Sequence, residues 1–254
     1  GNAAVSFGGT VDGARDLTVN TTGATSFGGN VGSTTALNSV TTNTGGTVSI
    51  AGNVTTTTTQ TFNEAATVTA SSALMGTDIA FGDGLDLVDG GTGTLTVTGN
   101  LTVAGAVDVE ITGVSNPTAD NTDLIVVTGN LDLINATVSF TATTPDDASI
   151  TFATATGTLT VPTSAPTPPT GYVYDTTDPQ VLKLSGVPEI DIEGGTPAQS
   201  IADGDTTPDS ADDTDFGTHT EGDANVVRTF SINNDGTGDL DLLIADIGAP
   251  LEVS

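Results

Sequence analysis

The first 142 residues repeat themselves, and this repetition constrains the fold more than any other feature of the sequence. The segment SFGGTV at 6–11 returns as SFGGNV at 26–31. A Gly-Asn pair, or a close variant of it, then recurs at steps of 20, 23, 24, 23 and 30 residues, beginning at Gly9, Gly29, Gly52, Gly76, Gly99 and Gly129. A near-constant period of this length is typical of a solenoid, in which each repeat forms one turn of a stack.

Short segments within each repeat alternate apolar and polar residues with period two. Examples are GTVSI at 46–50, TLTVTG at 94–99 and DLIVVTG at 123–129. Period two is the pattern of a strand with one buried face. Thr and Val, which dominate these segments, are branched at the β-carbon and fit strands better than helices. The sequence therefore predicts an all-β protein.

Three short strands with their turns fill one repeat, so the first zone is predicted to form stacked rungs of a parallel β-helix. An aliphatic residue directly follows five of the six markers, and we expect these five at equivalent inward positions: Val11, Val31, Val54, Leu101 and Leu131. Gly and Asn tolerate the positive φ of tight turns, and stacked Asn residues can form an amide ladder. The alternative interpretation is that the Gly-Asn pairs mark unrelated hairpin turns.

A resemblance to a known family comes from DNTDLIVVTGNLDLINATVSF at 120–140. This segment resembles the strand pattern of filamentous-haemagglutinin-like and autotransporter passenger regions, carried here by Asp123, Ile125, Val127, Gly129 and Leu133. The resemblance covers about residues 1–187 and implies a right-handed parallel β-helix. It also implies a secreted surface protein or adhesin.

The predicted β-helical domain spans residues 1–187 and ends in a terminal cap. A Pro-rich excursion at 162–171 interrupts the pattern, and GYVYD at 171–175 then restores a strand-like segment. We interpret Tyr172 and Tyr174 as part of a partly buried cap strand, with contact to a ligand as the alternative.

The last zone, residues 188–254, resembles a second family. It is similar to the opening half of choice-of-anchor D, ASH-like immunoglobulin-type domains, in PEID at 188–191, IADGD at 201–205, DFG at 215–217, RTF at 228–230 and NDGTG at 234–238. The resemblance implies an immunoglobulin-like β-sandwich. Such sandwiches need about 100 residues, so we expect this one to be incomplete or completed by another chain.

The chain carries a formal net charge of −29, with three basic residues, Arg15, Lys183 and Arg228. A nucleic acid partner is excluded, because nothing can neutralise its phosphates. No apolar stretch approaches the roughly 20 residues that span a bilayer, so membrane insertion is not expected. The acidic surface suits either solubility or the binding of divalent cations.

The run DGDTTPDSADDTD at 203–215 gathers carboxylates in the pattern of a calcium loop. Calcium prefers six to eight oxygen ligands from a flexible polar loop. The predicted ligands are Asp203, Asp205, Asp209, Asp213 and Asp215, with Asp212 nearby. The alternative is a solvated acidic loop that binds nothing.

Catalytic residues are scarce, and the sequence favours a protein that is not an enzyme. There is no Cys, and the single histidine, His219, lies in a polar stretch. Asp83, Asp86 and Asp89 could supply the paired carboxylates of a glycosidase. No Lys or Arg lies between Arg15 and Lys183 to assist chemistry on an acidic sugar.

These observations favour an extracellular structural or adhesive segment of a large surface protein or fibre. Its partners would be copies of itself, or the rest of a longer parent chain, joined head to tail through Ala3–Phe7 or through Leu240–Ile247. One alternative is an adhesin module that binds surface glycans. A polysaccharide-active β-helix enzyme is a third, weaker alternative.

Overall fold

The structure, a computed structural model, describes residues 1–87, 93–112, 121–143, 149–220, 222 and 224–241. All the regular secondary structure in these ranges is β-strand, which confirms the predicted all-β class. The chain divides into two compact units, Gly1–Ser185 and Gly186–Ser254. The sequence had suggested a boundary two residues later.

The first unit contains two sheets of mostly parallel strands. Within the described residues, one sheet has eight strands: β1 (Val5–Phe7), β3 (Ala24–Phe27), β5 (Thr47–Ile50), β8 (Ala65–Val68), β10 (Leu85–Leu87), β12 (Gly105–Thr112), β13 (Asn121–Thr122) and β16 (Ala136–Thr143). The described part of the other has twelve: β2 (Asp16–Val19), β4 (Ser39–Thr42), β6 (Val54–Thr55), β7 (Thr59–Phe62), β9 (Ser72–Phe81), β11 (Thr94–Val103), β14 (Leu124–Thr128), β15 (Leu131–Asp132), β17 (Ser149–Ala155), β18 (Leu159–Thr160), β19 (Tyr172–Asp175) and β20 (Val181–Gly186).

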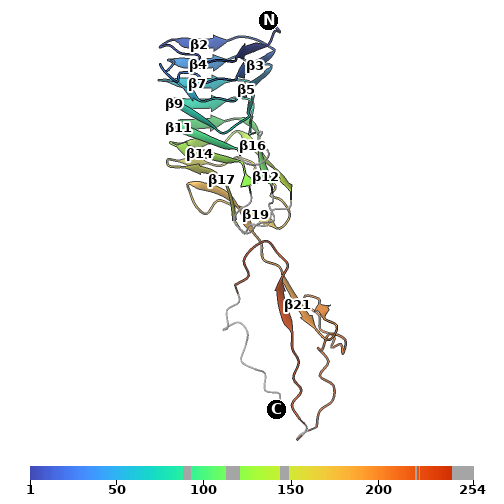
Figure 1. Cartoon of the computed structure of the whole chain (residues 1–254). Coiled ribbons are helices and arrows are strands. Elements are labelled where there is room, and N and C mark those ends of the chain that lie inside the picture. The colour runs from blue at the N-terminus through green and yellow to red at the C-terminus, as the bar shows by residue number, and fades with distance from the viewer. Residues whose placement is uncertain (88–92, 113–120, 144–148, 221, 223, 242–254) are drawn as a thin grey trace. The chain divides into compact units, whose positions relative to one another are not determined.

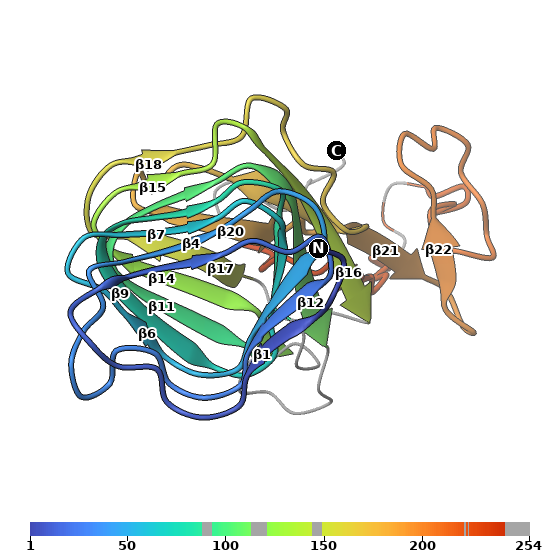
Figure 2. The same ribbon diagram turned by 90° about the horizontal axis from the view of Figure 1, so that it is seen from above.

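Most strands of this unit pair in parallel with a strand one repeat further along the chain, as β1 does with β3 and β3 with β5, so the repeats form layers (Figure 1). β1, β3, β5 and β8 are consecutive neighbours in one sheet, and β2, β4, β7 and β9 are consecutive neighbours in the other. Seen along the stack, successive layers overlie one another around a shared interior (Figure 2). At the far end the pattern changes, because β20 pairs with β17 in the antiparallel direction.

The five aliphatic residues that follow the Gly-Asn markers do not share one position, contrary to our prediction. Val11 pairs with Val31 and Val31 with Val54, and Val54 continues to Leu74 in β9. Leu101 and Leu131 lie in a second column of inward-facing residues. In this column Leu101 pairs with Leu131 and with Ile79, and not with the residues that continue the column of Val54. The Gly-Asn motif therefore serves two different corners of the layers.

Both corners favour Gly for the same reason, which explains why one motif appears at each. A Cβ on Gly29 would lie 2.6 Å from the carbonyl oxygen of Gly9 in the layer before. A Cβ on Gly129 would lie 2.2 Å from the carbonyl oxygen of Gly99. The layers thus approach closely at both corners, and sequence spacing alone does not distinguish the two.

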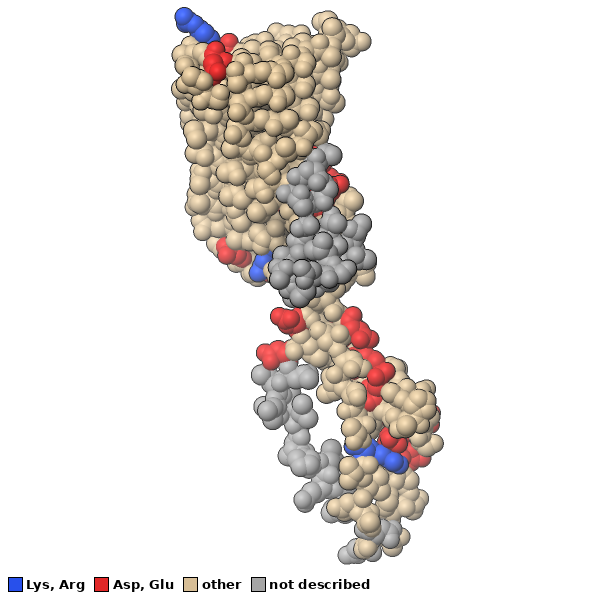
Figure 3. All heavy atoms as spheres, in the orientation of Figure 1, with Lys and Arg blue, Asp and Glu red and all other residues tan. Residues whose placement is uncertain are grey.

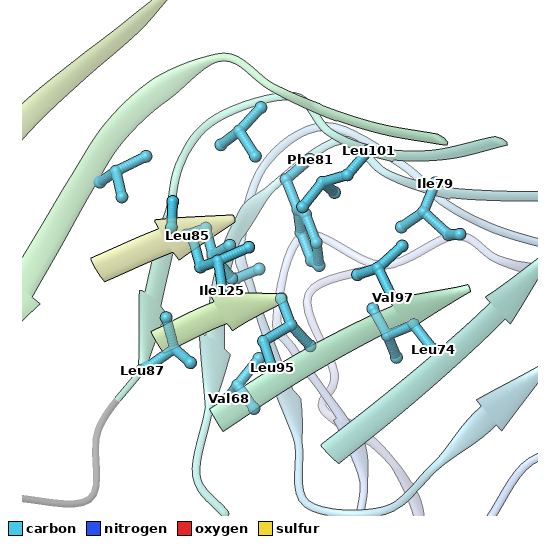
Figure 4. Close-up of a cluster of buried hydrophobic side chains, with 14 of the residues drawn as sticks. Val68, Leu74, Ile79, Phe81, Leu85, Leu87, Leu95, Val97, Leu101 and Ile125 are labelled. Carbon is cyan, nitrogen blue, oxygen red and sulfur yellow. The ribbon is translucent and has the colours of Figure 1, made fainter. Parts of the chain in front are cut away.

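Apolar side chains from successive layers pack together in the interior between the two sheets, and Figure 4 shows part of this cluster. Phe27, Phe62 and Phe81 are among the largest fully buried residues. Aromatic rings stack between layers, with ring centroids 5.2 Å apart for Phe7 and Phe27 and 5.1 Å apart for Phe62 and Phe81. Burying a side chain of this size contributes about 1.5–3 kcal/mol, so the stacked rings of both sheets stabilise the stack.

The second unit is a small antiparallel sheet formed by β21 (Ile190–Gly194), β22 (Gln199–Ile201) and β23 (Ser231–Asn234). Ile192 pairs with Ile232 across the sheet, and their side chains are 38% and 43% exposed. These two isoleucines are thus far less buried than the apolar residues inside the first unit. Residues 242–254, which include most of the predicted contact segment Leu240–Ile247, lie outside the described residues.

Candidate functional site

The predicted calcium ligands lie in the second unit, in the chain that follows β22. Asp203, Asp205, Asp209 and Asp215 are exposed, and Asp213 is half-buried. Acidic side chains are dense on the surface of this unit and sparse on the visible face of the first (Figure 3).

Several of these carboxylates bind their own turns. Asp205 Oδ1 accepts the Thr207 N–H at 2.8 Å, and Asp209 Oδ1 accepts the Ala211 N–H at 2.8 Å. Asp215 Oδ1 accepts the Gly217 N–H at 2.8 Å. Bonds of this kind, two residues along the chain, fix local turns, so these side chains shape the loop whether or not an ion is present.

Two further carboxylates of the loop have partners of other kinds. Asp213 Oδ1 lies 3.3 Å from Nη1 of Arg228 in an ion pair. Hydrogen bonds from the Thr214 hydroxyl and N–H lower the pKa of Asp212, which is buried. Within the described ranges, no three acidic or histidine side chains come close enough together to hold a metal ion. Calcium binding at this loop stays a prediction.

A second group of carboxylates lies on the outer side of β10 and β12. Asp86 and Asp108 are direct neighbours across the two strands. Burial, with repulsion from Asp108 and Glu110, raises the pKa of Asp86. Asp108 accepts hydrogen bonds from Ser139 Oγ at 2.8 Å and Thr141 Oγ1 at 3.0 Å.

Of the carboxylates considered for hydrolysis, Asp86 belongs to this group, Asp83 is exposed in the preceding turn, and Asp89 lies outside the described residues. No basic residue occurs in the sequence between 15 and 183 to balance the group. Its arrangement offers hydrogen-bond acceptors and negative charge.

The asparagines of the Gly-Asn motifs form ladders at both corners, although not amide to amide as predicted. Asn53 N–H donates to Asn30 Oδ1 at 3.0 Å, and Asn130 N–H donates to Asn100 Oδ1 at 3.1 Å. Thr158 N–H continues the second ladder by donating to Asn130 Oδ1 at 2.8 Å. Each side-chain oxygen thus accepts a backbone N–H of the next layer.

A shallow groove of about 440 Å³ runs beside the second ladder. Its polar lining comes from successive layers: Asp78, Asn100, Thr102, Asn130, Asp132, Thr158 and Thr160. Asn100 Nδ2 donates to Asp78 Oδ1 at 2.9 Å. The groove therefore presents a repeating row of hydroxyl, amide and carboxylate groups.

The remaining polar candidates, two tyrosines and a histidine, contact the core or the backbone. Tyr172 is buried in the core, and Tyr174 stacks on Phe152 with ring centroids 6.1 Å apart. Burial raises the pKa of Tyr174 to about 12. His219 is exposed, with Nε2 2.9 Å from the carbonyl oxygen of Phe216.

Glu64 is a buried acidic residue that the sequence pattern did not lead us to single out. Glu64 is 1% exposed inside the first unit. The signal was present, because the alternation that turns Gln60 and Phe62 inward also turns Glu64 inward.

Comparisons with models of known protein families, with curated proteins and with solved structures found no match. The two family resemblances stay predictions. In the described residues, no helix is long and apolar enough to cross a membrane.

Proposed function

We propose that this chain is a structural segment of an extracellular surface protein or fibre. In this proposal the first unit is a right-handed parallel β-helix, and the second is an immunoglobulin-like sandwich that another chain segment completes. The observation that carries the proposal is the in-register parallel pairing of repeat after repeat in the first unit. Such a stack can be extended at its end without changing its geometry.

The first layer presents an open edge that suits extension. β1 and β2 are terminal strands of their sheets. Val5, Phe7, Val11 and Leu17 of this layer are only partly buried, whereas the inward residues Phe27, Val31 and Val40 of the next layer are buried. Unpaired strand edges with apolar neighbours favour pairing with another chain.

The distribution of basic residues also favours assembly through the open edge of the first layer. Among the described residues, the ion pairs join Lys183 to Asp175 at 3.4 Å and Arg228 to Asp213 at 3.3 Å, and Arg15 takes part in neither. Arg15 lies directly before β2, in the first layer. A second, acidic copy of the chain would supply a partner for this guanidinium group. The proposed assembly is head to tail, with the first layer as one of its two contact surfaces.

Gly9 offers a sharp test of this assembly. A Cβ at Gly9 meets nothing within 4 Å in the single chain. A second copy could dock on the first layer in the register seen inside the stack. A carbonyl oxygen of that copy would then clash with a Cβ on Gly9, just as the Gly9 carbonyl oxygen would clash with a Cβ on Gly29. Gly9→Val should therefore reduce assembly and leave the melting temperature of the single chain unchanged.

The measurement is light scattering over a range of concentrations, with electron microscopy of the same samples. Wild-type chains are expected to form elongated particles that grow with concentration, and Gly9→Val chains are expected to stay short. Gly29→Val is the matched control, since its Cβ clashes inside the chain and should lower stability. A wild-type monomer at every concentration, or a Gly9→Val chain that assembles normally, would contradict the proposal.

A second candidate function is the binding of surface glycans, favoured by the groove beside the second ladder. Hydroxyl, amide and carboxylate groups in a row suit the hydroxyl groups of a sugar chain. Thr102→Val should then weaken binding on a glycan array, while Thr41→Val, in an outer position three layers away, should not. Equal loss in both variants would point to a general surface effect instead.

A further inference from the structure

The interior of the first unit contains a carboxyl group without a hydrogen-bond partner. Glu64 lies between β7 and β8, and both of its carboxyl oxygens are buried and unpartnered. The hydroxyl oxygen of Thr25 in β3 is also buried without a partner. The Thr25 and Thr42 hydroxyls lie beside the Glu64 carboxyl and favour its ionised form, although neither reaches it in a hydrogen bond of ordinary length and angle.

The layers around Glu64 supply no compensating positive charge. In the preceding layer it faces Gly46, where a Cβ would lie 3.1 Å from Glu64 Oε2. In the following layer the register of Leu85 with Ala66 places Asp83 beside it, and Asp83 is exposed. Thr25 and Thr42 are its neighbours from β3 and β4. Among the described elements that pack against Glu64, Asp83 is therefore the titratable residue that lies next to it.

The basic residues of the chain lie elsewhere. Arg15 precedes β2, at the opposite end of that row of strands from the Glu64 corner. Lys183 is paired with Asp175, and Arg228 belongs to the second unit. An ionised Glu64 would therefore be a buried charge without an ion-pair partner, which is a strongly unfavourable arrangement.

Burial raises the pKa of Glu64 above its ordinary value of 4.5, and the nearby Thr25 and Thr42 hydroxyls oppose this rise. The direction fixes the sign of the pH effect. A carboxyl whose pKa is raised by folding contributes its full stability below the unfolded pKa. That stability is lost as the pH rises through the folded value.

We propose that Glu64 makes the stability of the first unit depend on protonation: its neutral carboxyl donates a hydrogen bond to Thr25 Oγ1, and its ionisation loosens the packing of β3, β5 and β8. Acid conditions then strengthen this part of the stack, and alkaline conditions weaken it. The proposal concerns the interior of a single chain and does not depend on the assembly proposed above.

Glu64→Gln separates this effect from the general repulsion among 32 acidic residues. The carboxamide has the same shape, can donate to Thr25 and cannot ionise. Asp83→Asn is the matched control, because it removes an exposed carboxylate in the adjacent layer. High salt adds a second control, since it screens exposed charges far more than a buried one.

The experiment follows unfolding of the full chain from pH 4 to pH 8 by circular dichroism in 1 M salt. Glu64→Gln is expected to raise the melting temperature at pH 8 and to reduce its fall with rising pH, while Asp83→Asn follows the wild type. A pH dependence unchanged by Glu64→Gln would overturn the proposal.

A direct readout uses the wild-type chain and needs no variant. The side-chain carboxyl carbon of Glu64, observed by NMR with carbon-13 glutamate, is expected to titrate above pH 4.5. Protection of the Ala66 amide from hydrogen exchange should fall over the same pH range after correction for the intrinsic exchange rate. Titration of Glu64 at or below 4.5 would sink the proposal even if Glu64→Gln failed to fold.

Discussion

The two units use β-strands in opposite ways. In the first, 16 acidic residues are spread over 185 positions, and strands of successive layers cover one another's apolar faces. In the second, 16 acidic residues occupy 69 positions, and Ile190, Ile192 and Ile232 stay 38–44% exposed. Stacking gives a strand a neighbour that repeats its pattern, whereas the described residues of the second unit form three strands and no second sheet to cover their apolar side.

The comparison teaches that a strand pattern alone does not make a core. The alternation in IDIEG at 190–194 is as regular as that in TVSI at 47–50, and Ile50 is fully buried while Ile192 is not. The difference is the presence of a covering layer. The predictions below test whether the two units differ in stability as their packing suggests.

The largest expected difference concerns aromatic residues. Phe62→Ala in the first unit removes a fully buried ring that stacks on Phe81 and should cost about 3–5 kcal/mol of unfolding free energy. Phe230→Ala in the second unit removes a ring that is 38% exposed and should cost about 1 kcal/mol or less. Chemical denaturation of both variants checks this, and equal losses would show that the second unit has a core of its own.

A smaller effect is expected at the ladder. Asn130→Ala removes the oxygen that accepts the Thr158 N–H, and loss of one such hydrogen bond costs about 1 kcal/mol. Asn20→Ala, at an exposed asparagine between β2 and β3, is the control and should change stability by less than about 0.5 kcal/mol. If both variants unfold alike, the ladder contributes nothing to the stability of the stack.

The smallest expected effect concerns calcium in the second unit. With free calcium equal to its dissociation constant, binding stabilises by about 0.4 kcal/mol, so chelation should lower the melting temperature of this unit slightly. Asp205→Asn should reduce that response, and Asp235→Asn, outside the loop, should not. Titration calorimetry that detects no binding at millimolar calcium would leave the solvated acidic loop as the correct interpretation.

Much of the first unit could be predicted from the sequence, because alternation and period determine which residues face inward and which layers pair. The prediction failed at Leu101 and Leu131, since the Gly-Asn motif meets the same steric demand at two corners. Glu64 was missed for a different reason. Charged residues are expected at the surface. That expectation outweighed the alternation, which places Glu64 on the same inward face as Gln60 and Phe62.

The candidate site was harder to predict. The spacing of Asp203, Asp205 and Asp209 suggested convergence on an ion, yet Asp205 and Asp209 each bind a backbone N–H two residues further along. Short-range turn bonds of this kind arise from the same residues that suggest a metal loop. Sequence spacing cannot separate the two uses.

The in-register layering of the first unit is the basis of the proposed function, and engineered disulfides test it most directly. Ser26 and Ser49 are direct neighbours in adjacent layers, and the natural chain contains no cysteine. Parallel neighbours about 5 Å apart are within the Cα distance that a disulfide allows. In dilute solution, a chain with Ser26→Cys and Ser49→Cys should form an intramolecular disulfide, seen as a mass loss of two hydrogens. A chain with Ser26→Cys and Thr67→Cys, two layers apart, should not, and equal bridging in the two chains or none in the first would contradict the layered structure.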